Sequence, residues 1–423
     1  MKVTKCRMCD SSNLEEYIDL GHQPPSDAFL TKEQTKEPIT HYPLNVVLCK
    51  DCGLSQLGYV VPPEILYQQE YPYESSTTEK GRKHYWDFAD SVSAIANVME
   101  GELVIDIGSN VGVLLEGFKN NGAKVLGIDP APNIVKKAND RGIETICEFF
   151  GSEVADSVVR KYGEASVITG TNVFAHVNNL FDFMRGVYTL LEERGVFVFE
   201  SPSLLELVKN NAYSSIYHEH LSYLSLKPVV KFAKRMGLEV VRVEKHDIHE
   251  GSFRVFITKS LDWPIDKSVN EYLEEEEESG IHNIATLKEF GYKAHEHLRA
   301  LDKLVRKLKG DKKDGESSIV LLSAPAKGMT IVNSLKWNHK LIEYATEKTP
   351  LKVGKFLPGG SIPVVEDRAL LQSEPEYALI MAWNFQEEII RNNMEYLNRG
   401  GKFIQLFPYI QVINKEMLEA KQS

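Results

Sequence analysis

The alternation of apolar and polar positions divides the chain into segments of different period. Between residues 102 and 258, short apolar runs alternate with stretches of helical spacing; the runs are LVIDIG, KVLGID, SVITGTN and VFVFES. This rhythm is typical of a parallel sheet with helices on both faces. It predicts a doubly wound, Rossmann-like α/β domain within residues 63–265, with a helix in the stretch HYWDFADSVSAIANVM near its start.

The same kind of pattern returns near the C-terminus. The runs SIVLLSA, LIEYAT, YALIMAW and KFIQLF predict a second Rossmann-like α/β domain over residues 316–415, followed by a tail over residues 416–423. Between the two domains, the charged run EYLEEEEESG opens a polar helical stretch, which predicts a helical linker over residues 266–315.

Four of the five cysteines form two CxxC pairs at the front of the chain, Cys6 with Cys9 and Cys49 with Cys52. Each pair presents two thiolates from one tight turn, and two pairs supply the four tetrahedral ligands that zinc prefers. A site filled entirely by protein ligands has no position for water or substrate, so its role is structural. We therefore expect a zinc-binding module over residues 1–62, with idle or paired cysteines in a reduced compartment as the alternative.

The balance of 49 basic against 60 acidic residues gives a net charge of −11. This charge repels a polyanion at long range, so nucleic-acid binding is disfavoured, whereas a single small phosphate ligand remains compatible with a few local donors. The start, MKVTKCRMCD, has no apolar segment of a signal peptide, and no run has the length of a membrane span. We expect a cytoplasmic protein, monomeric and soluble, that does not contact membranes.

The first apolar run ends in an acidic residue and a glycine-containing turn, LVIDIGSNVG, that leads into a helical stretch. Such a turn lets a ligand approach the backbone closely at the carboxyl edge of the sheet, where doubly wound folds bind nucleotides. Asn tolerates a left-handed backbone better than other residues with a side chain, which suits Asn110 to a position that is often glycine. The residues predicted to form this cofactor loop are Gly108, Ser109, Asn110 and Gly112.

Asp129 ends the next apolar run, as suits a carboxylate that accepts hydrogen bonds from both ribose hydroxyls. Asp106 would lie beside the cationic methionine part of S-adenosylmethionine, whereas a diphosphate would be repelled there. Asn172 and His176 follow the fourth strand, in TGTNVFAHVNNL, and are expected at the same crevice. The pattern favours S-adenosylmethionine over a nicotinamide cofactor. A solvated loop position for His176, and glycines that serve only the turn, remain as alternatives.

The densest chemical cluster is IYHEHLSYLS, in which Tyr217, His218, Glu219 and His220 are consecutive. Two histidines, a carboxylate and a phenol offer a base that works near neutral pH, an orienting partner and an oxyanion donor. This set suits proton abstraction next to a carbonyl. A metal site is less favoured because HEH lacks the histidine pair at i and i+4 of a helical zinc motif. A surface tetrad without a role is the other alternative.

The second α/β segment opens with SIVLLSAPAKGMTIVN, a strand that enters a turn and then a helix. The free amides and positive dipole at such a helix start attract phosphate, and Lys327 adds a formal charge. This arrangement suits the diphosphate of a nucleotide sugar, with a purely architectural lobe as the alternative.

A series of motifs spans nearly the whole chain: CxxC…CxxC, YPYESS, DIGSNVG, NVFAHV, YHEHLSYLS, HEGSFRVF, AKG, PGGSIPV and AWNF. In this order they resemble the nucleotide-sugar C-methyltransferases. These are three-domain enzymes that add a branching methyl group to carbon 3 of 4-keto deoxysugars, as in mycarose-type and tetronitrose-type sugars. The resemblance is specific because the zinc module and the carboxy-terminal domain are both present.

The resemblance implies roles for individual residues. His220, which closes the YHEH motif, would be the general base that removes the proton beside the 4-keto group. Tyr217 would hydrogen-bond the enolate oxygen, and Glu219 would orient or polarise its neighbours. His176 is a second candidate for binding the developing negative charge.

The resemblance also implies residues outside that motif. Tyr73 in YPYESS is the best match to a tyrosine that lines the family's site, with Tyr71 in reserve. The C-terminal domain and its PGGSIPV loop, around Gly359 and Gly360, would bind a dTDP- or GDP-linked sugar, and Arg254 in GSFRVF matches a further substrate-binding position. S-adenosylmethionine would deliver methyl to the enolate carbon without a metal, so zinc would stay structural.

Two other functions remain open on the sequence. Methylation of an oxygen or nitrogen would make His220 a base toward a hydroxyl or amine. A non-catalytic nucleotide-sugar-binding protein would keep the fold and lose turnover, although the intact set of Asp106, Asp129, His176 and residues 217–220 argues against this function.

Overall fold

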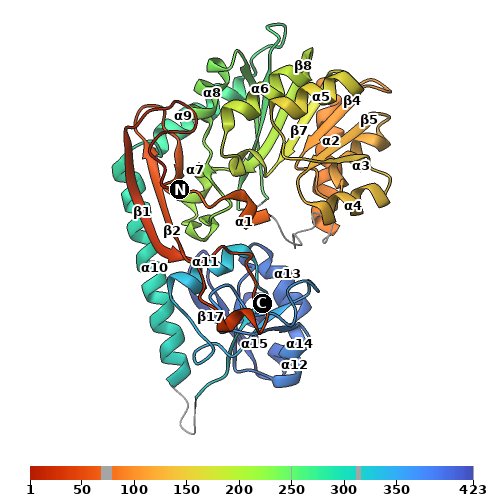
Figure 1. The fold of residues 1–423 in the computed structure, drawn as a ribbon. Helices are drawn as coiled ribbons and strands as arrows, with labels where there is room; N and C mark the ends of the chain where they lie inside the picture. Colours follow the sequence, from red (N-terminus) through yellow and green to blue (C-terminus); the bar gives the residue numbers. More distant parts are fainter. Residues whose placement is uncertain (68–78, 249, 311–315, 423) are drawn as a thin grey trace. The chain divides into compact units, whose positions relative to one another are not determined.

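The computed structural model describes residues 1–67, 79–248, 250–310 and 316–422 (Figure 1). The chain forms two compact units. The N-terminal unit consists of Met1–Glu16, Val46–Leu207 and His220–Thr286, and the C-terminal unit of Tyr17–Asn45, Val208–Glu219 and Leu287–Ser423. The domain boundaries predicted from the sequence stay a prediction.

A small sheet lies beside the two cysteine pairs: Cys6 and Cys9 precede its first strand, and Cys49 and Cys52 lie where its second strand turns into its third. Its strand order is β1-β2-β3-β9, with β1 (Leu14–Gln23), β2 (Tyr42–Cys49), β3 (Ser55–Leu57) and β9 (Ser222–Tyr223). The last strand lies far along the chain from the other three, and its antiparallel pairing joins Gln56 to Ser222 and Ser55 to Tyr223. The segment that follows the YHEH motif is therefore hydrogen-bonded to the zinc module.

The main sheet of the N-terminal unit has the strand order β10-β11-β8-β7-β4-β5-β6. Its strands are β4 (Leu103–Ile107), β5 (Lys124–Asp129), β6 (Thr145–Cys147), β7 (Ala165–Thr171), β8 (Leu191–Pro202), β10 (Glu239–His246) and β11 (Ser252–Thr258). The five strands from β8 to β6 pair in parallel, whereas β11 and β10 pair antiparallel at one edge. The predicted doubly wound fold is confirmed. β4 lies between β5 and β7, so the chain reverses its winding there, and open α/β sheets bind ligands at the carboxyl ends of strands at such a point.

The helices of this part of the chain follow from apolar stripes at helical spacing. In α2 (Glu79–Ala96) the buried residues are Tyr85, Phe88, Ala89 and Val92, which form one face at i, i+3, i+4 and i+7. This face packs on α3 and completes the hydrophobic core above the sheet. The other helices are α1 (Pro63–Tyr67), α3 (Val113–Asn120), α4 (Pro132–Asp140), α5 (Ser152–Tyr162), η2 (Phe174–His176), α6 (Leu180–Leu190), α7 (Leu204–Lys209), α8 (Leu226–Arg235) and α9 (Lys267–Ser279).

The C-terminal unit contains a second α/β sheet with the order β14-β13-β12-β15-β16-β17. All neighbours pair in parallel except β16 and β17. The strands are β12 (Ile319–Leu322), β13 (Ala345–Glu347), β14 (Val364–Glu366), β15 (Tyr377–Ile380), β16 (Lys402–Gln405) and β17 (Gln411–Ile413). The helices are η1 (Gln34–Lys36), η3 (Tyr213–Ser215), α10 (Ile284–Gly310), α11 (Ala326–Ser334), α12 (Ala369–Ser373), η4 (Trp383–Phe385), α13 (Gln386–Asn392), α14 (Met394–Asn398) and α15 (Lys415–Gln422).

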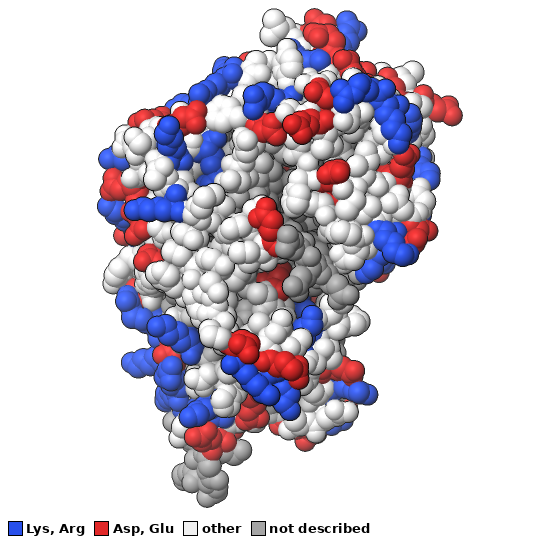
Figure 2. All heavy atoms as spheres, viewed as in Figure 1, with Lys and Arg blue, Asp and Glu red and all other residues white. Residues whose placement is uncertain are grey.

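Among the described residues, no helix combines the length and the apolar character that a bilayer crossing requires. On the face drawn in Figure 2, Lys and Arg side chains are interspersed with Asp and Glu, and those described there form no continuous basic stripe.

Candidate active site

The loop after β4 has the left-handed backbone that its sequence predicts. Gly108, Asn110 and Gly112 adopt φ values of 69°, 50° and 81°. A Cβ atom on Gly108 would lie 2.2 Å from Cγ2 of Val173, so this position has no room for a side chain. Asn110 holds its conformation without glycine, as Asn does more readily than other residues with a side chain.

Asp129, at the end of β5, fixes this loop from the neighbouring strand. One carboxylate oxygen accepts the amide of Asn110 at 3.0 Å, and the other accepts the amide of Ala131 at 2.9 Å. Burial raises the pKa of Asp129, and these two amides oppose that shift. The two predicted halves of the cofactor site are thus joined by a direct hydrogen bond.

Asp106, at the end of β4, is a buried carboxyl group whose exposed fraction is 2%. Its Oδ1 accepts a hydrogen bond of 2.7 Å from Oγ1 of Thr169 on β7. Burial raises the pKa of Asp106 to about 7, the Thr169 hydrogen bond opposes the rise, and the charge of Asp129 adds to it. A ligand cation beside Asp106 would stabilise the ionised form. Thr169 was not predicted from the sequence; its signal is a polar residue in an apolar strand that pairs with β4.

Asn172 follows β7 with a φ of 56°, and its amide donates to the carbonyl of Glu200 at 2.8 Å. Ser109 is buried in the loop after β4. Both residues lie where parallel strands end, as predicted, and their contact with a cofactor remains a prediction.

His176 and His220 approach each other within the N-terminal unit. Their ring centroids are 4.9 Å apart and the ring planes meet at 73°. His176 ends η2, directly after β7, and His220 precedes β9. Burial lowers the pKa of His176 to about 4, so its imidazole is neutral at physiological pH. The side chain of His176 is half-buried, so it is less exposed than a solvated loop residue, and its role in the site stays a prediction.

The rest of the YHEH motif belongs to the C-terminal unit, whose segment ends at Glu219. Glu219 is buried, and burial raises its pKa well above the ordinary value; the charge of Asp27 adds to the rise and that of Lys352 opposes it. The raised pKa favours the protonated carboxyl group, which can donate a hydrogen bond. The alternative of a surface tetrad is wrong, because His218, Glu219 and His220 are all buried.

His218 has a different environment from its neighbours. Its Nε2 lies 3.3 Å from the carbonyl oxygen of Tyr42, and its ring meets the Tyr42 ring edge to face. Burial lowers the pKa of His218 to about 4, against the opposing effect of the Tyr42 and Pro43 backbone. These contacts give His218 a packing role.

Arg254, predicted as a substrate contact, lies in a buried ion-pair network. Its Nη2 is 2.8 Å from Oε2 of Glu200 and its Nη1 is 3.6 Å from Oε2 of Glu244. The guanidinium group also stacks over the ring of Phe88 at 3.7 Å from the centroid. Nε2 of His84 contacts the other oxygen of Glu200 at 2.7 Å. The charge of Arg254 is thus balanced internally, and a contact with substrate remains a prediction.

The C-terminal unit brings Lys327 and Gly359 to one end of its sheet. Lys327 lies in the first turn of α11, directly after the loop that follows β12. Gly359 has a φ of 103°, and a Cβ atom there would lie 2.8 Å from Oδ1 of Asn333, also on α11. The PGGS loop with Gly359 and Gly360 therefore runs against the helix that carries Lys327. The predicted tyrosines Tyr71 and Tyr73 lie outside the described residues.

Glu347, which the sequence analysis did not identify, ends β13 in the position that Asp129 has in the main sheet. Its Oε2 accepts the amide of Ala324, in the loop after β12, at 3.4 Å. Its Oε1 accepts the amides of Lys348 and Thr349 at 2.8 and 3.2 Å. In both sheets a carboxylate thus holds a loop of the neighbouring strand: Asp129 at the end of β5 holds the loop after β4, and Glu347 in β13 holds the loop after β12.

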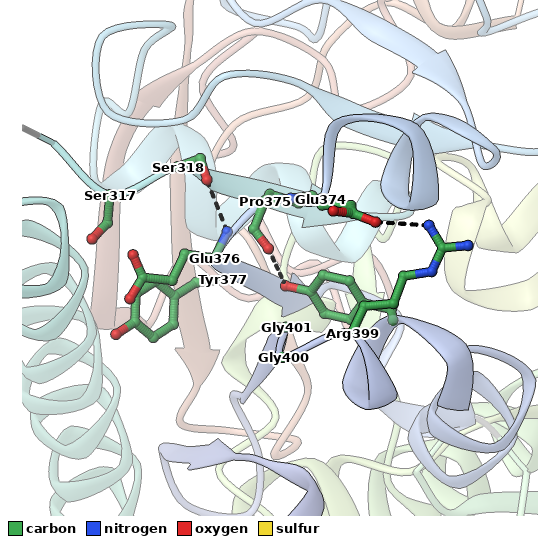
Figure 3. Close-up of a pocket in the computed structure, with 10 residues that line it drawn as sticks. Ser317, Ser318, Glu374, Pro375, Glu376, Tyr377, Arg399, Gly400 and Gly401 are labelled. Carbon is green, nitrogen blue, oxygen red and sulfur yellow. Dashed lines mark hydrogen bonds and ion pairs between the residues drawn. The ribbon is translucent and has the colours of Figure 1, made fainter.

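A cavity of about 570 Å³ lies at the opposite end of the C-terminal sheet (Figure 3). Ser318 and Glu376 line it directly before β12 and β15, and Arg399 pairs with Glu374 beside them. Open α/β sheets bind ligands at the carboxyl ends of their strands, whereas this cavity lies at the amino ends. We do not assign the substrate to it.

The four cysteines of the CxxC pairs converge at one point. Sulfur atoms of Cys6 and Cys52 are 3.5 Å apart, as are those of Cys9 and Cys49, and all four lie within 4.8 Å of one another. Tetrahedral zinc with Zn–S bonds of about 2.3 Å places its sulfur ligands about 3.8 Å apart. The residues fit a structural zinc ion.

Three family models match the chain in sequence order. The "Putative zinc binding domain" matches residues 6–67, the "Methyltransferase domain" residues 83–243, and the "C-methyltransferase C-terminal domain" residues 247–408. Fold, cofactor loop and matches together define an S-adenosylmethionine-dependent methyltransferase with a structural zinc site.

The C-methyltransferase NovU from Streptomyces niveus is 34% identical to this chain over 415 residues, which are 98% of each protein. The chain belongs to this C-methyltransferase family. A ubiquinone biosynthesis O-methyltransferase from Cupriavidus pinatubonensis is 24% identical over 166 residues, 36% of this chain and 65% of that protein. Family membership therefore favours methylation of carbon over methylation of oxygen or nitrogen.

Among solved structures, an S-adenosylmethionine-dependent methyltransferase from Clostridium acetobutylicum is 13% identical, with a TM-score of 0.35. The match covers 42% of this chain and 92% of that protein. Magnesium protoporphyrin IX methyltransferase from Synechocystis with bound SAH is 14% identical, also with a TM-score of 0.35. The match covers 44% of this chain and 90% of that protein.

Proposed function

We propose that this C-methyltransferase transfers a methyl group to carbon 3 of a nucleotide-linked 4-keto deoxysugar, through an enolate formed by His220. The observation that carries the proposal is the pairing of His220 with a neutral, half-buried His176 in the segment that follows β7. β7 is the strand beside β4, which carries Asp106, so the base and the cofactor loop belong to one structural unit.

The keto group acidifies the neighbouring C–H bond, and the imidazole of His220 takes this proton. The C–H electron pair then moves into the enolate, whose oxygen needs a hydrogen-bond donor. His176 suits this role because a neutral imidazole donates one N–H without a formal charge. Bound S-adenosylmethionine supplies the electrophilic methyl group. The enolate carbon would form the new C–C bond to this methyl group while the C–S bond breaks, and the electron pair of the C–S bond would return to sulfur.

Glu219 and Tyr217 are proposed as further donors. A protonated Glu219 donates a hydrogen bond where a carboxylate would repel the enolate. Tyr217 is assigned to the enolate oxygen by its place in the motif. Tyr73 is proposed to line the same site.

We propose that the C-terminal unit binds the nucleotide part of the substrate. The helix start at α11 with Lys327 suits the diphosphate, and the adjacent PGGS loop suits a close approach of the ligand to backbone. Glu347 supports a ribose at this end of the sheet, because a carboxylate after the second strand is where nucleotide-binding sheets hold ribose hydroxyls.

The test is mass spectrometry of dTDP- and GDP-linked 4-keto deoxysugars after incubation with the protein and S-adenosylmethionine in deuterated water. A gain of one methyl group supports methylation of the sugar, and NMR of the product shows whether carbon 3 carries the new methyl group. Deuterium uptake without methyl would support the base while excluding that sugar as the acceptor. No change in any sugar of the panel would contradict the proposed substrate class.

A further inference from the structure

A buried arginine connects the first cysteine pair to the residue that follows His220. Arg7 lies between Cys6 and Cys9, and 8% of it is exposed. Its Nη1 donates to the carbonyl of Leu221 at 3.0 Å, and its backbone amide donates to Oε1 of Gln56 at 3.0 Å. All these residues belong to the N-terminal unit.

The carbonyl of Leu221 receives a second donor from the same module. The amide of Leu57, at the end of β3, donates to it at 3.0 Å. The next two residues, Ser222 and Tyr223, then pair with β3. The segment after His220 is thus fixed by the strand that follows the second cysteine pair and by a side chain from the first.

Charge explains why an arginine can occupy this position. A buried guanidinium group is costly unless an opposite charge or several hydrogen bonds compensate it. Zinc held by four thiolates is a net negative centre, and Arg7 directly follows one of its ligands, Cys6. The loaded site would therefore stabilise the guanidinium group that reaches Leu221.

We propose that Arg7 is a positioning residue, which orients His220 by holding the carbonyl of Leu221 against the zinc module. The zinc site then serves the reaction as well as the fold of its own module. The role of His220 in this inference rests on the proposed function. The alternative is that Arg7 only stabilises the zinc module.

The test compares Arg7→Met, which removes the charge and the donors but keeps an unbranched apolar stem, with Arg7→Lys, which keeps the charge. Lys5→Met is the matched control, because Lys5 has an exposed side chain directly before the same turn. Zinc content, S-adenosylmethionine affinity, NMR titration of the His220 imidazole and hydrogen exchange over residues 219–225 are measured on the full chain. None of these readouts uses a sugar, so they can succeed or fail separately from the proposed substrate.

In Arg7→Met we expect unchanged zinc content and cofactor affinity within about twofold, since the cysteines and the cofactor loop are intact. The His220 resonance should shift, and exchange over residues 219–225 should rise at least about tenfold. Arg7→Lys should restore part of both effects, and Lys5→Met should change neither. With an accepted sugar, kcat should fall while KM for S-adenosylmethionine stays constant.

An unchanged His220 resonance and unchanged exchange in zinc-loaded Arg7→Met would overturn the proposal. Loss of zinc in both Arg7→Met and Arg7→Lys would also overturn it, because Arg7 would then act only on the module. Should Arg7→Met fail to fold, Arg7→Gln, which keeps amide donors but has a shorter reach, is judged by the same criteria.

Discussion

The imidazole rings of His176 and His220 meet edge to face, with centroids 4.9 Å apart. The two residues come from separate segments, one directly after β7 and the other directly before β9. The contact places a neutral, half-buried imidazole beside the proposed base.

The substitution His220→Asn should remove turnover while leaving cofactor binding intact. General-base catalysis contributes roughly 10²- to 10⁴-fold, and an amide cannot accept the proton at neutral pH. Steady-state kinetics and deuterium incorporation into the sugar measure the loss, and calorimetry measures the affinity for S-adenosylmethionine. His339→Asn, at an exposed histidine, is the control and should behave as wild type. Normal turnover in His220→Asn would show that another group is the base.

Binding of S-adenosylmethionine should depend on pH through Asp106. Burial raises the pKa of this carboxyl to about 7 in the free protein, and a bound cation lowers it again. Below pH 7, binding must therefore release a proton, and the affinity for S-adenosylmethionine should weaken by up to about tenfold for each pH unit of acidification. Above pH 7, the affinity should be constant.

Calorimetry in two buffers of different ionisation enthalpy detects the released proton. The substitution Asp106→Asn should weaken binding at pH 8 and abolish the proton release. A pH-independent affinity between pH 5 and 8 in the unchanged protein would argue against a cation beside Asp106.

The sequence predicts the two sheets well because their strands are short apolar runs closed by turn residues. Asp106 and Asp129 were predictable for the same reason, since an acidic residue at the end of a buried strand stands out from its surroundings. Thr169 and Glu347 were not identified, because each acts through a neighbouring strand and the register is not visible in one sequence.

Arg254 illustrates the opposite difficulty. A motif draws attention to the residue, but its partners Glu200 and Glu244 lie on two other strands. Sequence spacing therefore cannot show that the charge is balanced inside the unit. Whether this arginine also contacts substrate depends on geometry that a motif does not contain.

Glu347→Gln should weaken binding of the nucleotide sugar and leave binding of S-adenosylmethionine unchanged. A hydrogen bond to a charged group contributes about 1.5–3 kcal/mol, so the affinity for a dTDP or GDP sugar should fall roughly 10- to 100-fold. Glu366→Gln is a matched control, since Glu366 ends the neighbouring strand β14 and is exposed. Thermal unfolding separates a binding effect from loss of the turn that Glu347 holds. Equal affinity in both variants would exclude Glu347 from the nucleotide site.

Glu200→Gln should destabilise the N-terminal unit strongly. Burial opposes ionisation of Glu200, yet the hydrogen bond from His84 and the charge of Arg254 lower its pKa to about 2. Removal of this carboxylate leaves the buried guanidinium group of Arg254 without its main partner, at a cost of about 3–5 kcal/mol. Urea unfolding measures the loss. Asp87→Asn breaks an exposed ion pair with Lys83 and should cost at most about 1 kcal/mol.

The ion pair of Glu200 with Arg254 also makes the stability difference between wild type and Glu200→Gln depend on pH. Because the pKa of Glu200 is lower in the folded protein than its ordinary value of 4.5, its stabilising effect is present above about pH 4.5 and is lost as pH falls toward 2. The gap in unfolding free energy between wild type and Glu200→Gln should therefore be constant from pH 6 to 8 and shrink under acid. A gap at pH 3 as large as that at pH 7 would indicate that lost packing, and not lost charge, destabilises the variant.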